Sequence, residues 1–151
     1  MELKGSHSIA VPRSAVWQGL NDPVVLQACV PGCESFAETG PDQYAAVVVA
    51  AIGPVKAKFK GNLVISDKIA DGGYKLVGQG DGGIAGFGKM TAEVQLVDEG
   101  DGTLLTYSAQ AEVGGKMAQI GSRLVGSVAN KMAEEFFRRF SVKVAEGVGE
   151  V

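Results

Sequence analysis

Apolar and polar residues alternate with a period of two along most of the chain, and this period changes near Gly114-Gly115. Before this pair, the alternation predicts strands with one buried face at residues 55–66, 74–80, 90–96 and 104–113. After it, apolar residues recur about every four positions as far as Phe140, which predicts one long helix. This order of elements favours a curved antiparallel sheet closed by a C-terminal helix.

The first thirty residues predict a strand followed by two short helices. Leu3, Gly5, His7 and Ile9 share one face of the strand, and the polar residues between them take the other. Ser14 is expected to cap a helix that runs through Leu20. Asn21-Asp22-Pro23 breaks this helix and starts a second one, which ends before Pro31.

A nearly continuous apolar run at residues 44–52 predicts a strand with both faces covered. Turn sequences separate the strands, and they are Gly40-Pro41-Asp42, Gly53-Pro54, Asp71-Gly72-Gly73 and Glu99-Gly100-Asp101-Gly102. Such short connections favour a meander of neighbouring strands. The fold class expected is α+β, with about six to seven antiparallel strands, two short helices after the first strand and one long C-terminal helix.

Length and composition place the chain among globular single-domain proteins. We expect one ligand-binding domain over residues 1–146 and a flexible tail over residues 147–151, within a chain of 151 residues. The formal net charge of −3 offers no basic excess for a nucleic-acid partner. Neither a signal peptide nor an apolar run of about 18 residues is found, so we expect a cytoplasmic location.

The predicted inner face of the sheet carries an excess of small side chains. They are Ala46, Ala50, Ala57, Gly61, Gly78, Ala92, Ala109 and Ala111. Either the C-terminal helix fills this space to native density, or an apolar pocket remains between sheet and helix; we favour the pocket. The ligand-binding residues expected there are Phe59, Leu63, Tyr74, Met90, Tyr107, Leu124, Val128, Met132 and Phe136.

Two glycine-rich stretches match phosphate-binding patterns in spacing but not in context. Residues 83–89 read G-x-x-x-x-G-K, but Met90 stands where Ser or Thr must bind magnesium, and a strand pattern follows. Residues 78–83 satisfy G-x-G-x-x-G without opening a helix. We therefore exclude a nucleotide site and interpret these glycines as a close-packed strand corner where side chains would clash.

Residues for catalysis or metal binding are sparse. His7 is the sole candidate for acid–base chemistry near neutral pH, and we expect a hydrogen-bonded core histidine instead. No nucleophile–base pair or carboxylate pair can be placed on the inner face, so the sequence predicts no catalytic residue. Cys29 and Cys33 lack a second Cys/His pair, and we expect reduced thiols without metal or cofactor.

The charged residues that stand out in the sequence are a row of lysines, two Glu/Arg pairs and Arg123. Lys56, Lys58 and Lys60 form a row on one strand face, which is either a solvated surface or a contact for anionic lipid headgroups. The spacing of Glu134/Arg138 and Glu135/Arg139 predicts helix-stabilising ion pairs. The role of Arg123 stays open between a sheet-rim ion pair and a partner surface.

Several short segments together resemble one protein family. They are Val16-Trp17, Asn21-Asp22-Pro23, Cys29-Val30-Pro31-Gly32-Cys33, Ile52-Gly53-Pro54, Phe59-Lys60-Gly61 and residues 114–123, GGKMAQIGSR. In combination they resemble the G-subunit family of carbon monoxide dehydrogenase, over residues 1 to about 140. The family belongs to the START-like, helix-grip superfamily, so the resemblance implies a helix-grip fold that binds hydrophobic molecules between sheet and helix.

The resemblance also implies a function. Members accompany molybdenum hydroxylases of the carbon monoxide dehydrogenase type as non-catalytic proteins. They are implied in enzyme assembly, membrane recruitment or carriage of a lipophilic molecule such as quinone. The expected partners are thus a hydrophobic small molecule, molybdenum hydroxylase subunits and the inner face of a membrane. Two alternatives remain: an enzyme of the polyketide cyclase or hydrolase type on the same fold, and an assembly factor with a filled core.

Overall fold

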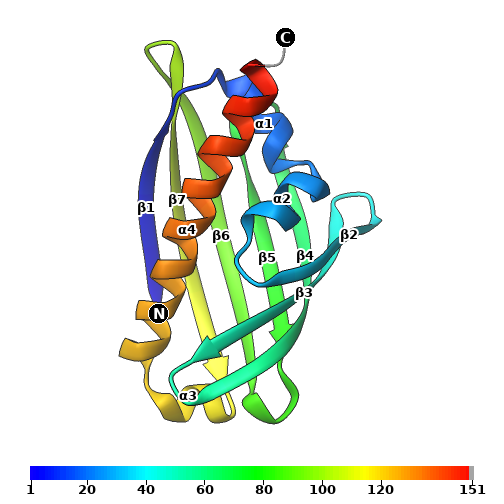
Figure 1. Ribbon diagram of the computed structural model, residues 1–151, viewed down its shortest axis with the longest axis vertical. Helices are drawn as coiled ribbons and strands as arrows, with labels where there is room; N and C mark the ends of the chain where they lie inside the picture. The colour runs from blue at the N-terminus through cyan, green and yellow to red at the C-terminus, as the bar shows by residue number, and fades with distance from the viewer. Residues whose placement is uncertain (150–151) are drawn as a thin grey trace.

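A single strongly curved sheet forms most of the molecule in the computed structural model, which describes residues 1–149 and side chains as far as residue 146 (Figure 1). Its strands are β1 (Glu2–Ile9), β2 (Cys33–Gly40), β3 (Gln43–Ile52), β4 (Val55–Ile69), β5 (Gly73–Asp81), β6 (Phe87–Glu99) and β7 (Gly102–Gly114). The seven strands pair in the order β1-β7-β6-β5-β4-β3-β2, and every pairing is antiparallel. The predicted meander is confirmed, and β1 joins it beside β7.

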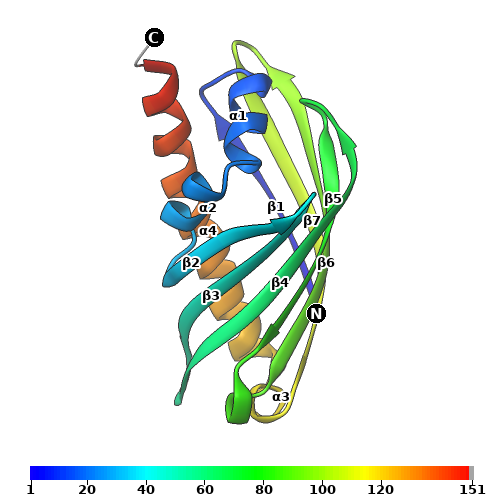
Figure 2. The same cartoon turned by 90° about the vertical axis from the view of Figure 1, so that its right-hand side faces the viewer.

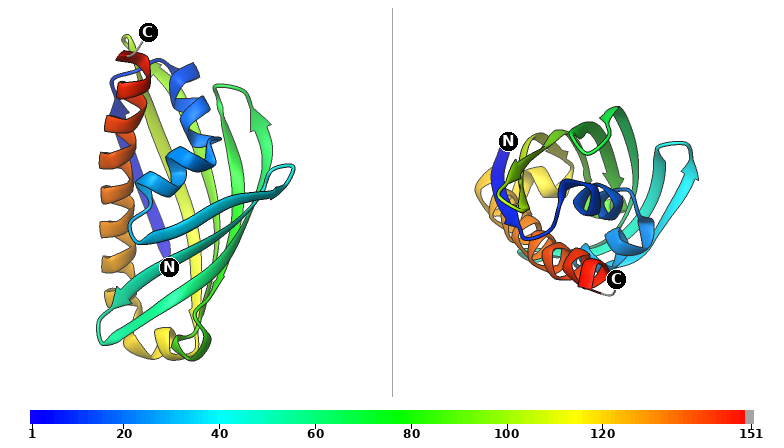
Figure 3. Two further views of the ribbon diagram at one scale, coloured as in Figure 1. Left: turned by 45° about the vertical axis from the view of Figure 1, so that its right-hand side comes forward. Right: turned by 90° about the horizontal axis from the view of Figure 1, so that it is seen from above.

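The helices lie over the concave face of the sheet or at one end of it (Figure 1). They are α1 (Arg13–Leu20), α2 (Pro23–Cys29), the 3₁₀ helix η1 (Gly83–Ala85), α3 (Lys116–Ile120) and α4 (Ser122–Gly149). Viewed from above, the sheet curves around one side of the molecule and α4 runs along its open side (Figure 3, right). Helices α1 and α2 lie on the concave side of the sheet, toward the end of the molecule opposite α3 (Figure 2). This is the helix-grip architecture that the sequence predicts.

The predicted single C-terminal helix is wrong in one respect, because Gly121 divides it. Gly121 has φ of 105° and ψ of 144°, a conformation that no helix accommodates and that favours glycine. The chain therefore ends α3 at Ile120 and restarts as α4 at Ser122. This break shifts the rotational phase of α4, so that the buried face begins at Val125 instead of Leu124.

The two N-terminal helices start differently. Ser14 lies inside α1 and does not cap it; the carbonyl of Pro12 accepts the amides of Ala15 and Val16 at 3.0 and 3.1 Å. Before α2, the carboxylate of Asp22 accepts the amide of Val24 at 2.9 Å, and a proline takes the first helical turn. The break between these two helices is therefore as predicted.

Strands β2 and β3 differ from the sequence prediction. The sequence pattern did not single out β2, which pairs with β3 through two irregularities, one at each end. The outer face of β3 is only partly covered, since Val47 and Val49 are half-buried and Ala51 is exposed.

Buried apolar residues form two clusters. The larger one joins α1, α4 and the strand ends near them, with Ile9, Val16, Leu105 and Phe140 at most 2 % exposed. The smaller one joins Ile52, Met117 and Val125 near α3.

Helix α4 continues as far as Gly149, so residues 147–149 of the expected tail are helical, and residues 150–151 lie outside the described residues. Within the described range, no helix is long and apolar enough to cross a membrane.

Candidate functional site: an apolar cavity between the sheet and α4

A cavity of about 360 Å³ lies between the inner face of β3–β7 and the helices α3 and α4. Its lining is almost entirely apolar. The volume falls within the range of roughly 300–1,000 Å³ that is typical of small-molecule sites. The predicted pocket between sheet and helix is therefore present.

The floor of the cavity is a row of residues with almost no side chain. Strand register places Ala46 opposite Gly61, Gly61 opposite Gly80 and Gly80 opposite Gly88. All four line the cavity. Because four neighbouring strands contribute at most one methyl group to this row, the sheet leaves space below the helix.

Two kinds of glycine are present in this part of the sheet. A Cβ at Gly61 would lie 2.9 Å from the carbonyl oxygen of Gln79, so close strand packing requires this glycine. A Cβ at Gly80 would meet no atom within 4 Å, and one at Gly78 or Gly88 would make only ordinary contacts of 3.7 Å or more. Predicted steric clashes therefore do not explain Gly78 and Gly80, which leave open space instead.

The roof of the cavity comes from the helices. Val125, Val128, Ala129 and Met132 of α4 face the sheet, together with Met117 of α3. Methionine side chains are flexible and polarisable, so they adapt to ligands of different shape. The helix side of the cavity can thus adapt to a ligand through its methionine side chains, whereas the shape of the sheet side is set by the strand backbone.

The structure brings part of the predicted ligand-binding set to the cavity. Phe59, Leu63, Met90, Val128 and Met132 line it. Phe59 also packs its ring against the backbone of Gly82, where a Cβ would lie 2.5 Å from Cε1.

The other predicted residues lie elsewhere. Tyr74 is 8 % exposed in the larger cluster, where Trp17 meets its ring edge-on at 5.8 Å between centroids. Tyr107 and Phe136 belong to an aromatic group around Phe137. Leu124 is 38 % exposed and contacts the turn at Gly53, because the break before α4 rotates it away from the sheet.

Several lining residues were missed by the sequence analysis. They are Met1, Leu3, Val48, Ile52, Gly80, Gly88, Val113, Met117, Val125 and Ala129. Gly80 and Gly88 were visible in the glycine-rich stretch but were assigned to close packing. The strand positions share the inner face with predicted residues, so alternation alone was a usable signal for them.

Polar side chains do not converge in the cavity. Asn62, Gln79, Lys89 and Glu112 border it, but all four are exposed residues at outward positions of the alternating strands. His7, Tyr74 and Tyr107 are not among the residues that line it. The described lining of the cavity is therefore suited to contact with an apolar molecule, and its polar residues lie at its border.

His7 belongs to the aromatic group and is not the hydrogen-bonded histidine that the sequence predicted. Its ring stacks on Phe137 at 4.1 Å between centroids and lies parallel to Tyr107 at 6.1 Å. None of the hydrogen bonds found among the described residues involves this ring. Burial lowers the pKa of His7, and the nearby carboxylate of Glu134 partly opposes this shift.

Both cysteines are free thiols. Cys29 is 1 % exposed, and burial raises its pKa against the opposing charges of Lys143 and Arg139. Cys33 donates from Sγ to the carbonyl of Ser35 at 3.2 Å, and burial raises its pKa as well. In the part of the chain that the structure describes, no group of three or more His, Cys, Asp or Glu residues could hold a metal ion.

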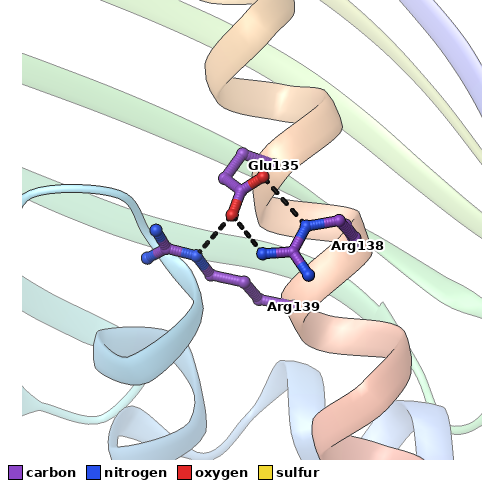
Figure 4. A network of polar contacts seen from close by, with 3 residues as sticks. All are labelled: Glu135, Arg138 and Arg139. Atoms are coloured by element: carbon purple, nitrogen blue, oxygen red, sulfur yellow. Dashed lines mark hydrogen bonds and ion pairs between the residues drawn. The ribbon is translucent and has the colours of Figure 1, made fainter.

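An ion-pair network on α4 lies beside α2 (Figure 4). Glu135 accepts from Nε of Arg139 at 2.8 Å and from Nε of Arg138 at 3.0 Å. These hydrogen bonds lower the pKa of Glu135 to about 2. Of the two predicted pairs, Glu135/Arg139 forms, whereas Arg138 turns to Glu135 and leaves Glu134 at the cleft between β1 and α4.

Comparisons with known proteins agree with this geometry. The family model that describes the G-subunit of carbon monoxide dehydrogenase (CoxG) matches residues 5–145. The comparison with curated proteins finds no significant relative.

Solved structures give the same fold. A conserved protein from Geobacillus kaustophilus is 34 % identical with a TM-score of 0.91, over 97 % of this chain and 96 % of that one. A START superfamily protein from Mycobacterium smegmatis has 15 % identity and a TM-score of 0.73, over 96 % and 97 % of the two chains. An aromatase/cyclase (Zhui) from Streptomyces sp. R1128 has 12 % identity and a TM-score of 0.68, over 98 % and 95 %.

Proposed function

Because the chain belongs to the CoxG family of carbon monoxide dehydrogenase, we propose that it is a non-catalytic accessory protein that binds a lipophilic molecule in the cavity under α4. The observation that carries this proposal is the row Ala46–Gly61–Gly80–Gly88 facing an apolar helix roof. The ligand class we propose is a quinone or a lipid, and the partner is a molybdenum hydroxylase of the carbon monoxide dehydrogenase type.

The size of the cavity limits the ligand. About 360 Å³ accommodates one compact ring system or a short stretch of an aliphatic chain. A longer isoprenoid or acyl chain would have to extend beyond the cavity. The absence of polar side chains aimed into the described cavity favours a ligand that is recognised by shape and apolar contact.

The alternative of a cyclase-type enzyme receives less support. A cyclase shares the fold at 12 % identity, which is a likeness of fold alone. The imidazole of His7 and the phenols of Tyr74 and Tyr107, the groups that such chemistry would need, lie outside the cavity lining. An assembly factor with a filled core is disfavoured by the cavity itself.

Fluorescence with an indole in the cavity wall tests the proposal. Trp17, the natural tryptophan, lies against Tyr74 in the larger cluster and is unsuited as a reporter. Phe59→Trp places an indole at the cavity, and titration with a short-chain quinone should quench it saturably. The unsubstituted protein, which reports only from Trp17, is the control and should show much weaker quenching.

Native mass spectrometry of the purified protein complements this titration by detecting a co-purified lipophilic molecule. Equal, unsaturable quenching of both proteins together with a ligand-free mass spectrum would refute the proposed function.

A further inference from the structure

A second hollow lies where α4 runs beside the end strand of the sheet. Strand β1 is that end strand, and α4 lies next to it (Figures 1 and 3). Between the two is a cleft of about 630 Å³. It is lined by residues 1–3 on one side and by α4 residues between Ser122 and Glu134 on the other. We call it the β1–α4 cleft.

The β1–α4 cleft adjoins the apolar cavity, and the side chains of Met1 and Leu3 line both spaces. The backbone of Met1 is fixed to β7, because its carbonyl accepts the amide of Ala111 at 2.8 Å. Its side chain reaches α4, where a Cβ at Gly126 would lie 3.2 Å from Sδ. Side chains therefore form the wall that the two spaces share, and the methionine can change its conformation.

The α4 side of the cleft consists of two rows of residues. One row contains Gly126, which lies at the shared wall, and Asn130 four residues further along. The other row places Ser127 between Arg123 and Lys131, each four residues away. Residues four apart on a helix are surface neighbours, with about 5–6 Å between their Cβ atoms. The second row therefore presents a hydroxyl group between two cations.

These polar groups are not engaged by other described residues. No ion pair found there involves Arg123 or Lys131. No side-chain hydrogen bond found there involves Ser127 or Asn130. The sheet-rim ion pair considered for Arg123 is thus not formed within the described chain. Its guanidinium and the neighbouring groups have donors to offer to an acceptor on a ligand.

The two carboxylates of the cleft leave the region of the shared wall positive. Glu2 is already paired with Lys4 at 3.1 Å. Glu134 lies eight residues beyond Gly126, about 12 Å along the helix axis. Arg123 lies only three residues before Gly126, about 4.5 Å along the axis. The charge on α4 nearest the wall is therefore a cation.

We propose that the β1–α4 cleft binds the head of an amphipathic ligand, an oxyanion carried on a single aliphatic chain. The carboxylate or phosphate head contacts Arg123, Ser127 and Lys131, and the chain passes the wall at Met1 into the apolar cavity. A guanidinium suits this role, because it donates to two oxygens of a carboxylate or phosphate at once. The inference rests on the proposed function and deepens it, since it selects one class of lipid among the lipophilic ligands.

Calorimetric titration of the delipidated protein tests the proposal with three ligands of equal chain length: decanoate, decyl phosphate and decanol. Both anions should bind at least roughly tenfold more tightly than decanol, because hydrogen bonds to charged groups are stronger than neutral ones. This preference should decrease at high salt. Inorganic phosphate, which has a head but no chain, should not compete with decanoate.

Substitutions on α4 locate the head and the chain. Arg123→Gln should lower decanoate affinity by about tenfold, and Arg123→Lys, which keeps the charge, should restore part of it. Arg138→Gln is the matched control, because it removes the same charge on the α2 side of α4, where Arg139 still pairs with Glu135. It should keep the full preference for decanoate. Val128→Trp fills the cavity and should abolish decanoate binding.

Two pairs of results would overturn the inference. Equal binding of decanoate and decanol, or an unchanged preference in Arg123→Gln, would exclude a head subsite in the cleft. Competition by inorganic phosphate, or decanoate binding that survives Val128→Trp, would exclude a ligand that spans cleft and cavity.

The Phe59→Trp reporter separates this inference from the proposed function. If a short-chain quinone quenches the reporter saturably while decanoate and decanol bind equally, the cavity binds apolar ligands and only the head subsite fails. If the reporter shows no saturable quenching and decanol does not bind, the proposed function itself fails.

Discussion

Filling the cavity from its floor should stabilise the ligand-free protein and prevent ligand binding. Gly80 is the suitable position, because it lines the cavity and a Cβ there would meet no atom within 4 Å. Gly80 does not have positive φ, so an L side chain adopts its backbone conformation without strain. Gly80→Leu would direct four carbon atoms into space that is already present.

The expected change in the free energy of unfolding caused by Gly80→Leu follows from apolar burial and from the conformational entropy of the chain. Burying about four carbon groups contributes roughly 3 kcal/mol, from which about 0.5–1 kcal/mol of side-chain entropy is lost. Removing a glycine from a strand adds about 0.5–1 kcal/mol. An imperfect fit reduces the sum, and we expect a net stabilisation of about 2 kcal/mol. For a chain of this size that corresponds to an increase in Tm of about 4–8 °C.

The sign of the stability change caused by Gly80→Leu distinguishes a cavity from a filled core. In a filled core the same insertion costs about 1–3 kcal/mol through displaced side chains. Thermal unfolding of delipidated protein and titration with a short-chain quinone are the two measurements. Gly40→Leu is the matched control, because Gly40 ends β2 away from the cavity and its nearest neighbour would be Oε1 of Gln43 at 3.6 Å. A lowered Tm with unchanged quinone binding in the Gly80 variant would refute the reasoning.

Three further predictions follow from the same geometry. Val128→Trp fills the cavity from its roof and should abolish quinone binding with little loss of Tm, as measured by the same two assays. Burial places the folded pKa of His7 below its unfolded value of 6.5, so its contribution to stability is present above that pH and decreases as the pH falls through the folded pKa. His7→Phe should keep the stack and flatten the decrease in urea-unfolding free energy between about pH 7 and pH 5; an unchanged slope would contradict this. Thiol titration should modify Cys33 in the folded protein and Cys29 only after unfolding, and elemental analysis should find no stoichiometric zinc or iron.

The fold was predictable because most strands bury one face and expose the other. Residues 55–66 alternate strictly, and β4 buries or half-buries their odd-numbered members from Val55 to Ile65. Strand β2 was not recognised, since bulges at its two ends interrupt alternation and most of its residues are exposed. The break at Gly121 was also missed, because a glycine inside a helical pattern can be tolerated and only backbone geometry shows that the helix stops.

The sequence predicts which residues point to the inner face of the sheet, but not where along the strands the cavity lies. Alternation correctly assigns Tyr74 and Tyr107 to the inner face. A period of two, however, carries no information on which part of a strand borders the cavity. Register decides this: Tyr74 pairs with Val94, and Tyr107 pairs with both Val94 and Gly5, toward α1 and away from the cavity floor. Long-range pairing of this kind is set by turn lengths and bulges, which the pattern along one strand does not contain.

The glycines of the cavity floor indicate why this sheet is not simply filled. Glycine within a strand costs about 0.5–1 kcal/mol relative to alanine, so a strand retains it only for a reason. Gly61 has a packing reason, because the carbonyl oxygen of Gln79 leaves no room for a Cβ. Gly80 has neither a clash nor a positive φ, yet it lies in the row between Gly61 and Gly88. Its remaining effect is the empty volume itself, so the cavity is produced by the sequence of the strands and not by a loosely fitting helix.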